Sequence, residues 1–570
     1  MRRLPGRLLM TLVAAALSAA CSVSGPRPSA PAGVAAPPSR IALPASPLSE
    51  EQRIVHVLNR LAYGPRPGDV ERVSQMGLAA WIERQLDPAQ IPDPAVERAL
   101  SAYPVLTMTA ADLLREYPRP NQQLVQKVKS GEMGRKEMMD AFPPDRRPSV
   151  ITAQMQSAKV LRAVMSERQL QEVMVDFWFN HFNVFAHKSA VRWMLPAYER
   201  EAIRPHALGR FKELVVATAR HPAMLFYLDN WMSTREDWVV PAGPNRGRKL
   251  GLNENYAREL MELHTLGVDG GYTQKDVVEV ARCFTGWTIE RPFDGGRFVF
   301  RAAAHDGGEK RVLGTVIGAG GGEQDGLRVI ELLVRHPSTA RFIATKLVRR
   351  FVADDPPEAL VLRVARTFQE TEGDIRAMLL AIFTSPEFFS DKAYRAKIKK
   401  PLEVVASAVR ALDGQVFSPG RDSGGAAGGA ALLGGGFPLS RQAASLGERL
   451  YEAQPPTGHP DVAEAWVNTG ALLGRMNFAL GLAHNRFPAT RVELGKALVG
   501  VDRRRPEEVL DRLLAVILQR QVSPDTRAVL AAQLDSPEIT RSTADDRGPG
   551  NTDVERLAAL VLGSPEFQRR

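Results

Sequence analysis

The sequence predicts an all-α protein, a multi-helix assembly with one small β-hairpin near residues 297–313. Apolar residues recur with the 3.6-residue period of amphipathic helices along most of the chain, whereas runs of β-branched residues are scarce. Alanine, aliphatic and charged residues dominate the composition, which favours helices. A chain of 570 residues can bury a large core. We therefore expect a single large helical domain over residues 49–570.

The N-terminus predicts export. Residues 1–20 combine a basic start, an apolar run from Leu8 to Leu17 and small residues before Cys21. This is the pattern of a secretory signal peptide, and it is short for a membrane span. A cysteine at this point is typical of a lipoprotein, in which Cys21 is lipidated; ordinary cleavage next to an incidental cysteine is the alternative. Residues 21–48 are rich in Pro, Ala and Ser and predict a disordered tether.

The predicted location is therefore outside the cytoplasm, on a membrane-anchored lipoprotein that faces the periplasm or the cell surface. The formal net charge of +10 is a modest excess, and no patch of basic and aromatic residues indicates nucleic acid. We expect a membrane partner through lipidated Cys21, and an envelope polymer or a small molecule as ligand. The sequence does not predict the oligomeric state.

Proline and glycine divide the helical pattern into segments. The predicted helices cover residues 51–63, 79–86, 149–185, 254–266, 274–284, 327–334, 339–351, 360–370, 375–383, 506–519 and 552–562. The segment 149–185 is one long helix or two abutting ones. Flexible loops are expected near residues 118–148, 235–251 and 414–436. The first of these is a mobile loop or a helical excursion over a cleft.

The stretch over residues 252–289 carries more chemically capable side chains than any other segment. With Asn253 as the N-cap, Glu254, Arg258 and Glu262 lie on one stripe of a regular helix. Two interpretations are open. The stripe is a solvated face with (i, i+4) ion pairs from Glu254 to Arg258 and from Arg258 to Glu262, or it is a metal or acid–base site.

The same stretch resembles the bacterial DUF1800 family, a family of unknown function, in the segments ENYARELMELHTLGV and GGYTQKDVVEVARCFTGWTI. Further similar segments are residues 58–88, FWFNHFNVF at 177–185, HDGGEKRVLG at 305–314, and SPEF at 385–388 and 564–567. The resemblance covers most of the chain after residue 50. It implies an exported, mostly helical protein, and it implies no reaction.

Histidines inside these motifs are the main candidates for chemistry. His181 lies on an apolar stripe, where a histidine is usually a satisfied core residue, and His305 and Asp306 lie between the two predicted strands of the hairpin. Two histidines and one carboxylate suffice for an iron or zinc site. We predict one cleft with the catalytic candidates His181, Glu254, Arg258, Glu262, His305 and Asp306. In this cleft His181, Glu262 and His305 could hold a divalent metal.

Familiar dense signatures are missing from the sequence: it has no HExxH, no CxxC pair and no G-x-S-x-G elbow. Two function classes therefore remain. The first is an exported, lipid-anchored envelope protein of unknown activity that could be a metal-dependent enzyme acting on an extracytoplasmic substrate. The alternative is a non-catalytic binding or assembly lipoprotein in which the same residues form a structural buried polar cluster.

Overall fold

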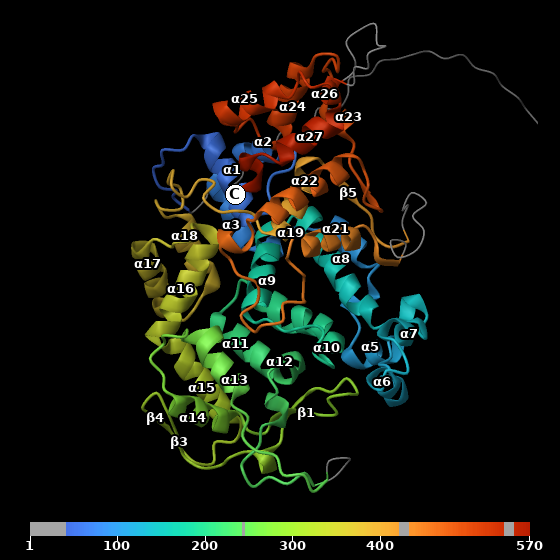
Figure 1. The fold of residues 1–570 in the computed structure, drawn as a ribbon. Coiled ribbons are helices and arrows are strands. Elements are labelled where there is room, and N and C mark those ends of the chain that lie inside the picture. Colours follow the sequence, from blue (N-terminus) through green and yellow to red (C-terminus); the bar gives the residue numbers. More distant parts are fainter. Residues whose placement is uncertain (1–40, 242–245, 421–431, 541–551) are drawn as a thin grey trace, which may run out of the picture. The chain divides into compact units, whose positions relative to one another are not determined.

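Helices account for most of the fold in Figure 1. This computed structural model describes residues 41–241, 246–420, 432–540 and 552–570, and residues Ser39–Arg570 form one compact unit. The predicted fold class is confirmed. The predicted signal peptide, Cys21 and most of the predicted tether lie outside the described residues. Within the described part of the chain, no helix combines the length and the apolar character that a membrane span needs.

The unit begins with short helices, and the first of them starts at a polar cap. Ser49 and Gln52 form a capping box at the first of them, and its buried face carries Ile54, Leu58 and Leu61. The helices of this part are α1 (Glu50–Leu61), α2 (Asp69–Met76), α3 (Leu78–Leu86), α4 (Pro94–Leu100), α5 (Ala110–Glu116), α6 (Gln122–Lys129) and α7 (Arg135–Asp140). The segment 118–148 thus contains α6 and α7, which pack against each other.

Two buried helices follow, α8 (Ser149–Met165) and α9 (Gln169–His181). They replace the single long helix that was one of the two predicted possibilities. Almost every residue of α8 is buried, as expected for a helix that is surrounded by other elements. Helices α1, α3 and α8 pack against α9. The next elements are α10 (Val191–Ala197), a π-helical segment (Tyr198–Ile203), α11 (Phe211–Arg220) and α12 (Pro222–Tyr227).

The stretch at 252–289 departs from a regular helix. Helix α13 covers only Asn255–Glu259, and the chain continues as a π-helical segment over Leu260–Thr265. The Leu266 amide donates a hydrogen bond to the Met261 carbonyl oxygen, and this spacing makes a wider turn than that of an α-helix. The predicted stripe of side chains therefore loses its regular spacing after Glu259. Helix α14 (Gln274–Phe284) begins at the predicted capping box of Thr273 and Asp276.

Six short strands form three antiparallel pairs in the described residues. Both strand segments of the predicted hairpin are strands, but each has another partner: β2 (Phe298–Phe300) pairs with β1 (Trp287–Ile289), and β3 (Lys310–Val312) pairs with β4 (Thr315–Ile317). The turn between β3 and β4 is Leu313-Gly314, and both residues have positive φ, as a two-residue type I′ hairpin requires. The third pair joins β5 (Gln415–Val416) to β6 (Thr490–Arg491).

The C-terminal half is again helical. Its helices are α15 (Glu323–Arg335), α16 (Pro337–Phe351), α17 (Glu358–Glu370), α18 (Ile375–Phe383), α19 (Pro401–Ala411), α21 (Gly436–Ser445), α22 (Thr469–Ala483), α23 (Leu494–Ala497), α24 (Pro506–Ile517), α25 (Pro524–Ala532), α26 (Pro537–Thr540), α27 (Val554–Leu562) and α28 (Pro565–Gln568). Helix α16 packs between α15 and α17, and α19 and α21 both contact α8. The later part of the chain thereby returns to the buried helices α8 and α9.

Candidate functional site

The six predicted catalytic residues fall into three groups with different neighbours. His181 ends α9, and His305 and Asp306 precede β3. Glu254 is the N-cap of α13, whereas Arg258 lies in α13 and Glu262 in its π-helical continuation. No hydrogen bond or ion pair within the described residues joins one of these groups to another. In the same ranges, no group of three or more His, Cys, Asp or Glu residues is placed to hold a metal ion. Their catalytic and metal-binding roles stay predictions.

Glu254 and Arg258 form the ion pair that the helical spacing suggested. Their charged atoms lie 3.1 Å apart on a half-exposed surface. The Gln274 side chain joins them, because it accepts a hydrogen bond from Arg258 at 2.8 Å and donates one to Glu254 at 2.7 Å. Glu262 lies near Tyr272, whose pKa is raised by partial burial and by the Glu262 carboxylate. These contacts are those of a solvated helix face.

His305 lies in a buried polar cluster that fastens β3 to its neighbours. Its Nδ1 lies 2.8 Å from the Thr285 carbonyl oxygen, and its Nε2 lies 3.2 Å from Asp325. Lys310 Nζ forms a second contact to Asp325 at 2.7 Å, and neither of these two side chains is exposed. Asp306 pairs with Arg282 of α14 at 2.7 Å. Both ring nitrogens of His305 are therefore engaged within the protein.

His181 has one engaged and one free ring nitrogen. Its Nε2 lies 3.1 Å from the backbone carbonyl oxygen of His264, in the π-helical segment. A carbonyl only accepts, so Nε2 carries the hydrogen. Burial lowers the pKa of His181 well below its usual value, and the charge of Lys346 lowers it further. The ring is therefore neutral, and Nδ1 keeps a lone pair that has no hydrogen-bond partner among the described residues.

A cavity of about 230 Å³ adjoins this histidine, and we call it the His181 pocket. Helix α9, helix α16, the residue before α19 and a loop after α21 contribute its walls. The lining residues are Phe177, Asn180, His181, Lys346, Arg349, Arg350, Lys400, Thr457, His459, Pro460, Asp461 and Val462. The FWFNHF motif thus meets the segment TGHPDV, which lies almost 280 residues later in the chain: Asn180 and His459 are 279 residues apart.

The loop is held by the side chain of Asn180. Its amide donates to the His459 carbonyl oxygen at 2.8 Å, and its carbonyl accepts from the His459 amide at 2.7 Å. Gly458 fits here for two reasons. Its φ is +69°, and an added Cβ would lie 2.4 Å from the backbone oxygen of Asn180. The loop therefore approaches the end of α9 more closely than a larger residue allows.

Four cationic side chains and one carboxylate line the pocket. Two of the cations belong to buried ion pairs: Arg350 lies 2.6 Å from Glu403, and Lys400 lies 3.2 Å from Asp176. Burial alone would raise the pKa of Glu403, but Arg350 and Arg570 outweigh it and lower that pKa to about 2. These acids are thus charged at neutral pH and neutralise the inner wall of the pocket.

The other two cations, Lys346 and Arg349, have no acidic partner within hydrogen-bond or ion-pair distance in the part of the chain that the structure describes. Arg349 donates through Nε to the backbone oxygen of Asp354 at 3.1 Å, and Lys346 Nζ lies 5.4 Å from the ring centroid of Phe342. Burial lowers the pKa of Lys346 to about 8, although Asp461 acts in the opposite direction. Near neutral pH both side chains are positively charged and available to an anion.

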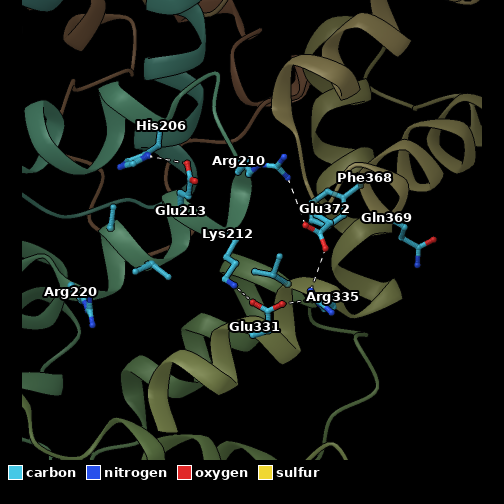
Figure 2. Close-up of a pocket in the computed structure, with 13 residues that line it drawn as sticks. His206, Arg210, Lys212, Glu213, Arg220, Glu331, Arg335, Phe368, Gln369 and Glu372 are labelled. Carbon is cyan, nitrogen blue, oxygen red and sulfur yellow. Dashed lines mark hydrogen bonds and ion pairs between the residues drawn. The ribbon is translucent and has the colours of Figure 1, made fainter. Parts of the chain in front are cut away.

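A larger cavity, of about 750 Å³, lies between α11, α15 and α17. Figure 2 shows that its charged side chains pair with one another across the helices: Lys212 with Glu331, Arg210 with Glu372, and Arg335 with both of these carboxylates. Its cations therefore already have anionic partners. The His181 pocket is the better candidate because its outer cations and one buried acceptor are free.

Sequence reasoning identified His181 in this pocket but missed Lys346 and Arg349. Both lie within the predicted helix 339–351, where a cation every three or four residues is the ordinary pattern of a solvated face. Their spacing of three residues places them on one side of α16. Only the fold shows that this side meets α9 and the loop that carries His459.

Comparison with known proteins gives a family and no closer relative. No curated protein and no solved structure matches the chain. The family model described as "Protein of unknown function (DUF1800)" matches residues 56–569, which is most of the sequence. The segments that suggested this family, from residue 58 to the final SPEF, fall inside the matched range. The chain therefore belongs to the DUF1800 family.

Proposed function

We propose that this protein is an exported envelope protein whose His181 pocket binds a small molecule through an anionic group. The observation that carries the proposal is the pair Lys346 and Arg349, two cations that face a cavity without an acidic partner among the described residues. A phosphate or a carboxylate fits this chemistry, because an ammonium and a guanidinium both form charge-assisted hydrogen bonds with such groups.

The energetics favour a ligand over a purely structural role. A half-buried ammonium without a carboxylate at ion-pair distance destabilises the folded protein, and the lowered pKa of Lys346 reflects the cost of its burial, which the more distant Asp461 offsets only in part. Groups that are kept in such a state are characteristic of binding and catalytic sites. The cavity of about 230 Å³ is smaller than typical sites for drug-sized ligands, so the ligand itself is small.

Binding of inorganic phosphate tests this proposal. Isothermal titration calorimetry on the purified protein is expected to show one site, and Lys346→Met or Arg349→Met should each weaken it by about tenfold or more, since hydrogen bonds to charged groups contribute about 1.5–3 kcal/mol. Arg341→Met is the matched control, because it removes an exposed cation from the same helix, where it pairs with Glu358 at 3.0 Å. Phosphate binding that survives both pocket substitutions would refute the proposal.

Export and lipidation rest on residues 1–21 alone. We propose that Cys21 is lipidated and anchors the protein to a membrane, so that the pocket faces the periplasm or the cell surface. In Cys21→Ala, fractionation and lipid labelling of cells should show release from the membrane fraction and loss of the lipid. Unchanged membrane association together with unchanged labelling would contradict the anchor.

A metal-dependent activity is a separate hypothesis. It requires His181, Glu262 and His305 to approach one ion within about 2.0–2.2 Å, and the engaged nitrogens of His305 do not favour it. Metal analysis of the purified protein decides this point. The alternative in which these residues only form a structural buried polar cluster draws support from buried ion pairs such as Lys159 with Asp176 at 2.8 Å. It predicts that Lys346→Met changes stability without changing phosphate binding.

A further inference from the structure

We infer that the cavity of about 750 Å³ between α11, α15 and α17 is a second binding site, and that its ligand is an uncharged molecule with an apolar body. We call this cavity the α11 pocket. It shares no lining residue with the His181 pocket, so the two sites are separate. Its volume lies within the range of sites that enclose a small organic molecule.

Apolar side chains from all three helices line the α11 pocket. Val216 and Ala217 of α11 are only half-buried, so they leave apolar surface open to water. Val334 of α15 and Phe368 of α17 belong to the hydrophobic core and line the same cavity. Apolar surface that stays in contact with water is unfavourable, and the apolar body of a ligand removes it from water.

The sequence of α11 explains why the apolar surface lies between charges. Lys212, Val216 and Arg220 are four residues apart, so they lie on one side of the helix. Glu213 and Ala217 follow them at the same spacing, and all five residues line the pocket. This side of α11 therefore has an apolar centre with a charged residue towards each end.

The charges around the α11 pocket cancel. Four cationic side chains and three carboxylates line it, and the fourth carboxylate is Glu323, which pairs with the lining residue Arg220. Figure 2 shows a chain of ion pairs that runs from α11 through Glu331 and Arg335 to Glu372. An ion meets no net charge here, and it would have to separate an existing pair. An uncharged ligand leaves the pairs intact, so the two pockets select ligands of different charge.

The uncharged dye N-phenyl-1-naphthylamine, which fluoresces in apolar surroundings, tests the site. The purified native protein is expected to bind one dye molecule in the α11 pocket. Ala217→Trp fills the space beside α11 and should abolish the fluorescence increase, whereas Ala217→Ser keeps the space and should retain it. Leu473→Ser, which removes an exposed apolar residue of α22, should retain it too. Dye binding that survives Ala217→Trp, or no binding by the native protein, would overturn the inference.

Val216→Glu is a second variant, which decides the point if Ala217→Trp does not fold. It changes a half-buried residue of a helix, and circular dichroism checks that the fold is kept. A carboxylate among the apolar side chains should weaken dye binding about fivefold or more. Unchanged affinity in a folded Val216→Glu protein would contradict the assignment of the site.

A charged relative of the dye tests the ligand class. The compound 8-anilino-1-naphthalenesulfonate has the same rings and one added sulfonate. Inorganic phosphate is present in this experiment, so that the His181 pocket does not compete for the sulfonate. The native protein is expected to bind the sulfonated dye about fivefold or more weakly than the uncharged one. If both dyes bind with equal affinity and both are lost in Ala217→Trp, the pocket accepts anions and the uncharged class is wrong.

Discussion

Lys346 and Arg349 differ in how their charge responds to pH. An arginine guanidinium is charged in proteins at every working pH. Burial lowers the pKa of Lys346 to about 8, so its ammonium loses the proton within the range where most proteins remain folded. The pocket therefore keeps both cations at neutral pH and only one of them in mildly alkaline solution.

Sulfate binding is expected to weaken as the pH rises through about 8. Sulfate keeps its charge across this range, so the change reports the protein, and a lowered lysine pKa means that the neutral amine dominates above about pH 8 instead of above about 10.4. Calorimetric titrations from about pH 6 to about pH 10 measure the effect. In Lys346→Met the affinity should be low and independent of pH over this range. A native affinity that stays constant up to about pH 10 would contradict the assignment.

Lys399 is a second lysine whose pKa is lowered by burial, and it does not line the His181 pocket. It is 4% exposed, and its Nζ lies 3.8 Å from the ring centroid of Phe567. Burial lowers its pKa to about 7, against the opposing effect of Glu403. The unfolded chain binds the proton up to about pH 10.4, so it holds more protons than the folded protein between about pH 7 and about pH 10.4. The free energy of unfolding should therefore rise across this interval.

Replacing Lys399 by Met is expected to stabilise the protein at neutral pH and to remove that rise, because the buried charge is gone. Urea unfolding at several pH values measures both effects. Lys392→Met, which changes an exposed lysine nearby in the sequence, should leave the free energy of unfolding nearly unchanged. A Lys399→Met protein that is less stable than the native one would show that the ammonium has a favourable partner.

At the scale of elements, buried ion pairs hold α9, α16 and α19 together beneath the pocket. Glu403 of α19 contacts Arg350 of α16 at 2.6 Å and Arg570 at 3.1 Å, and all three side chains are buried. Asp176 of α9 contacts Lys159 and Lys400. Removing one member of such a group leaves an uncompensated buried charge, which is costly even where the complete pair adds little stability.

Glu403→Gln should therefore lower the free energy of unfolding by about 3–5 kcal/mol. Chemical denaturation of the purified variant measures this loss. Glu508→Gln is the matched control, since it changes a solvent-exposed ion pair with Arg505 and should cost about 1 kcal/mol or less. Equal effects of the two substitutions would contradict the view that the Glu403 group stabilises the fold.

The His305 cluster belongs to the packing of β3 against α14 and α15. Asp325→Asn should destabilise the protein, because Lys310 loses its only buried carboxylate partner in the described residues. Phosphate binding by the folded fraction should be unchanged, since no residue of this cluster lines the His181 pocket. A folded Asp325→Asn protein that has lost phosphate binding would instead connect His305 with the functional site, as the sequence suggested.

Some elements could be predicted from the sequence and others could not, for physical reasons. Helix α14 follows from the capping box at Thr273 and from its apolar period. The π-helical segment at Leu260–Thr265 could not be predicted, because a 3.6-residue pattern does not reveal where one residue is added to a turn. The partner of β3 was missed because Leu313, which is apolar, adopts the positive φ of the turn.

At the scale of the whole described unit, the pocket is formed by segments that are far apart in the sequence. Residues 177–181, 346–350, 400 and 457–462 meet there. The motif that contains His181 could be recognised alone, whereas its meeting with α16 and with the loop at His459 depends on tertiary packing. Sequence reasoning also expected His181 and His305 to share one cleft, and the contacts of these residues are with different neighbours.

The central claim is that Lys346 and Arg349 hold an anion beside His181. Crystallographic soaking with selenate tests it most directly, because the anomalous signal of selenium locates the anion. We predict a peak in the His181 pocket, within hydrogen-bond distance of Lys346 Nζ and the Arg349 guanidinium, that is lost in Lys346→Met. An empty His181 pocket in crystals that hold selenate elsewhere, with the pocket open to solvent, would contradict the account.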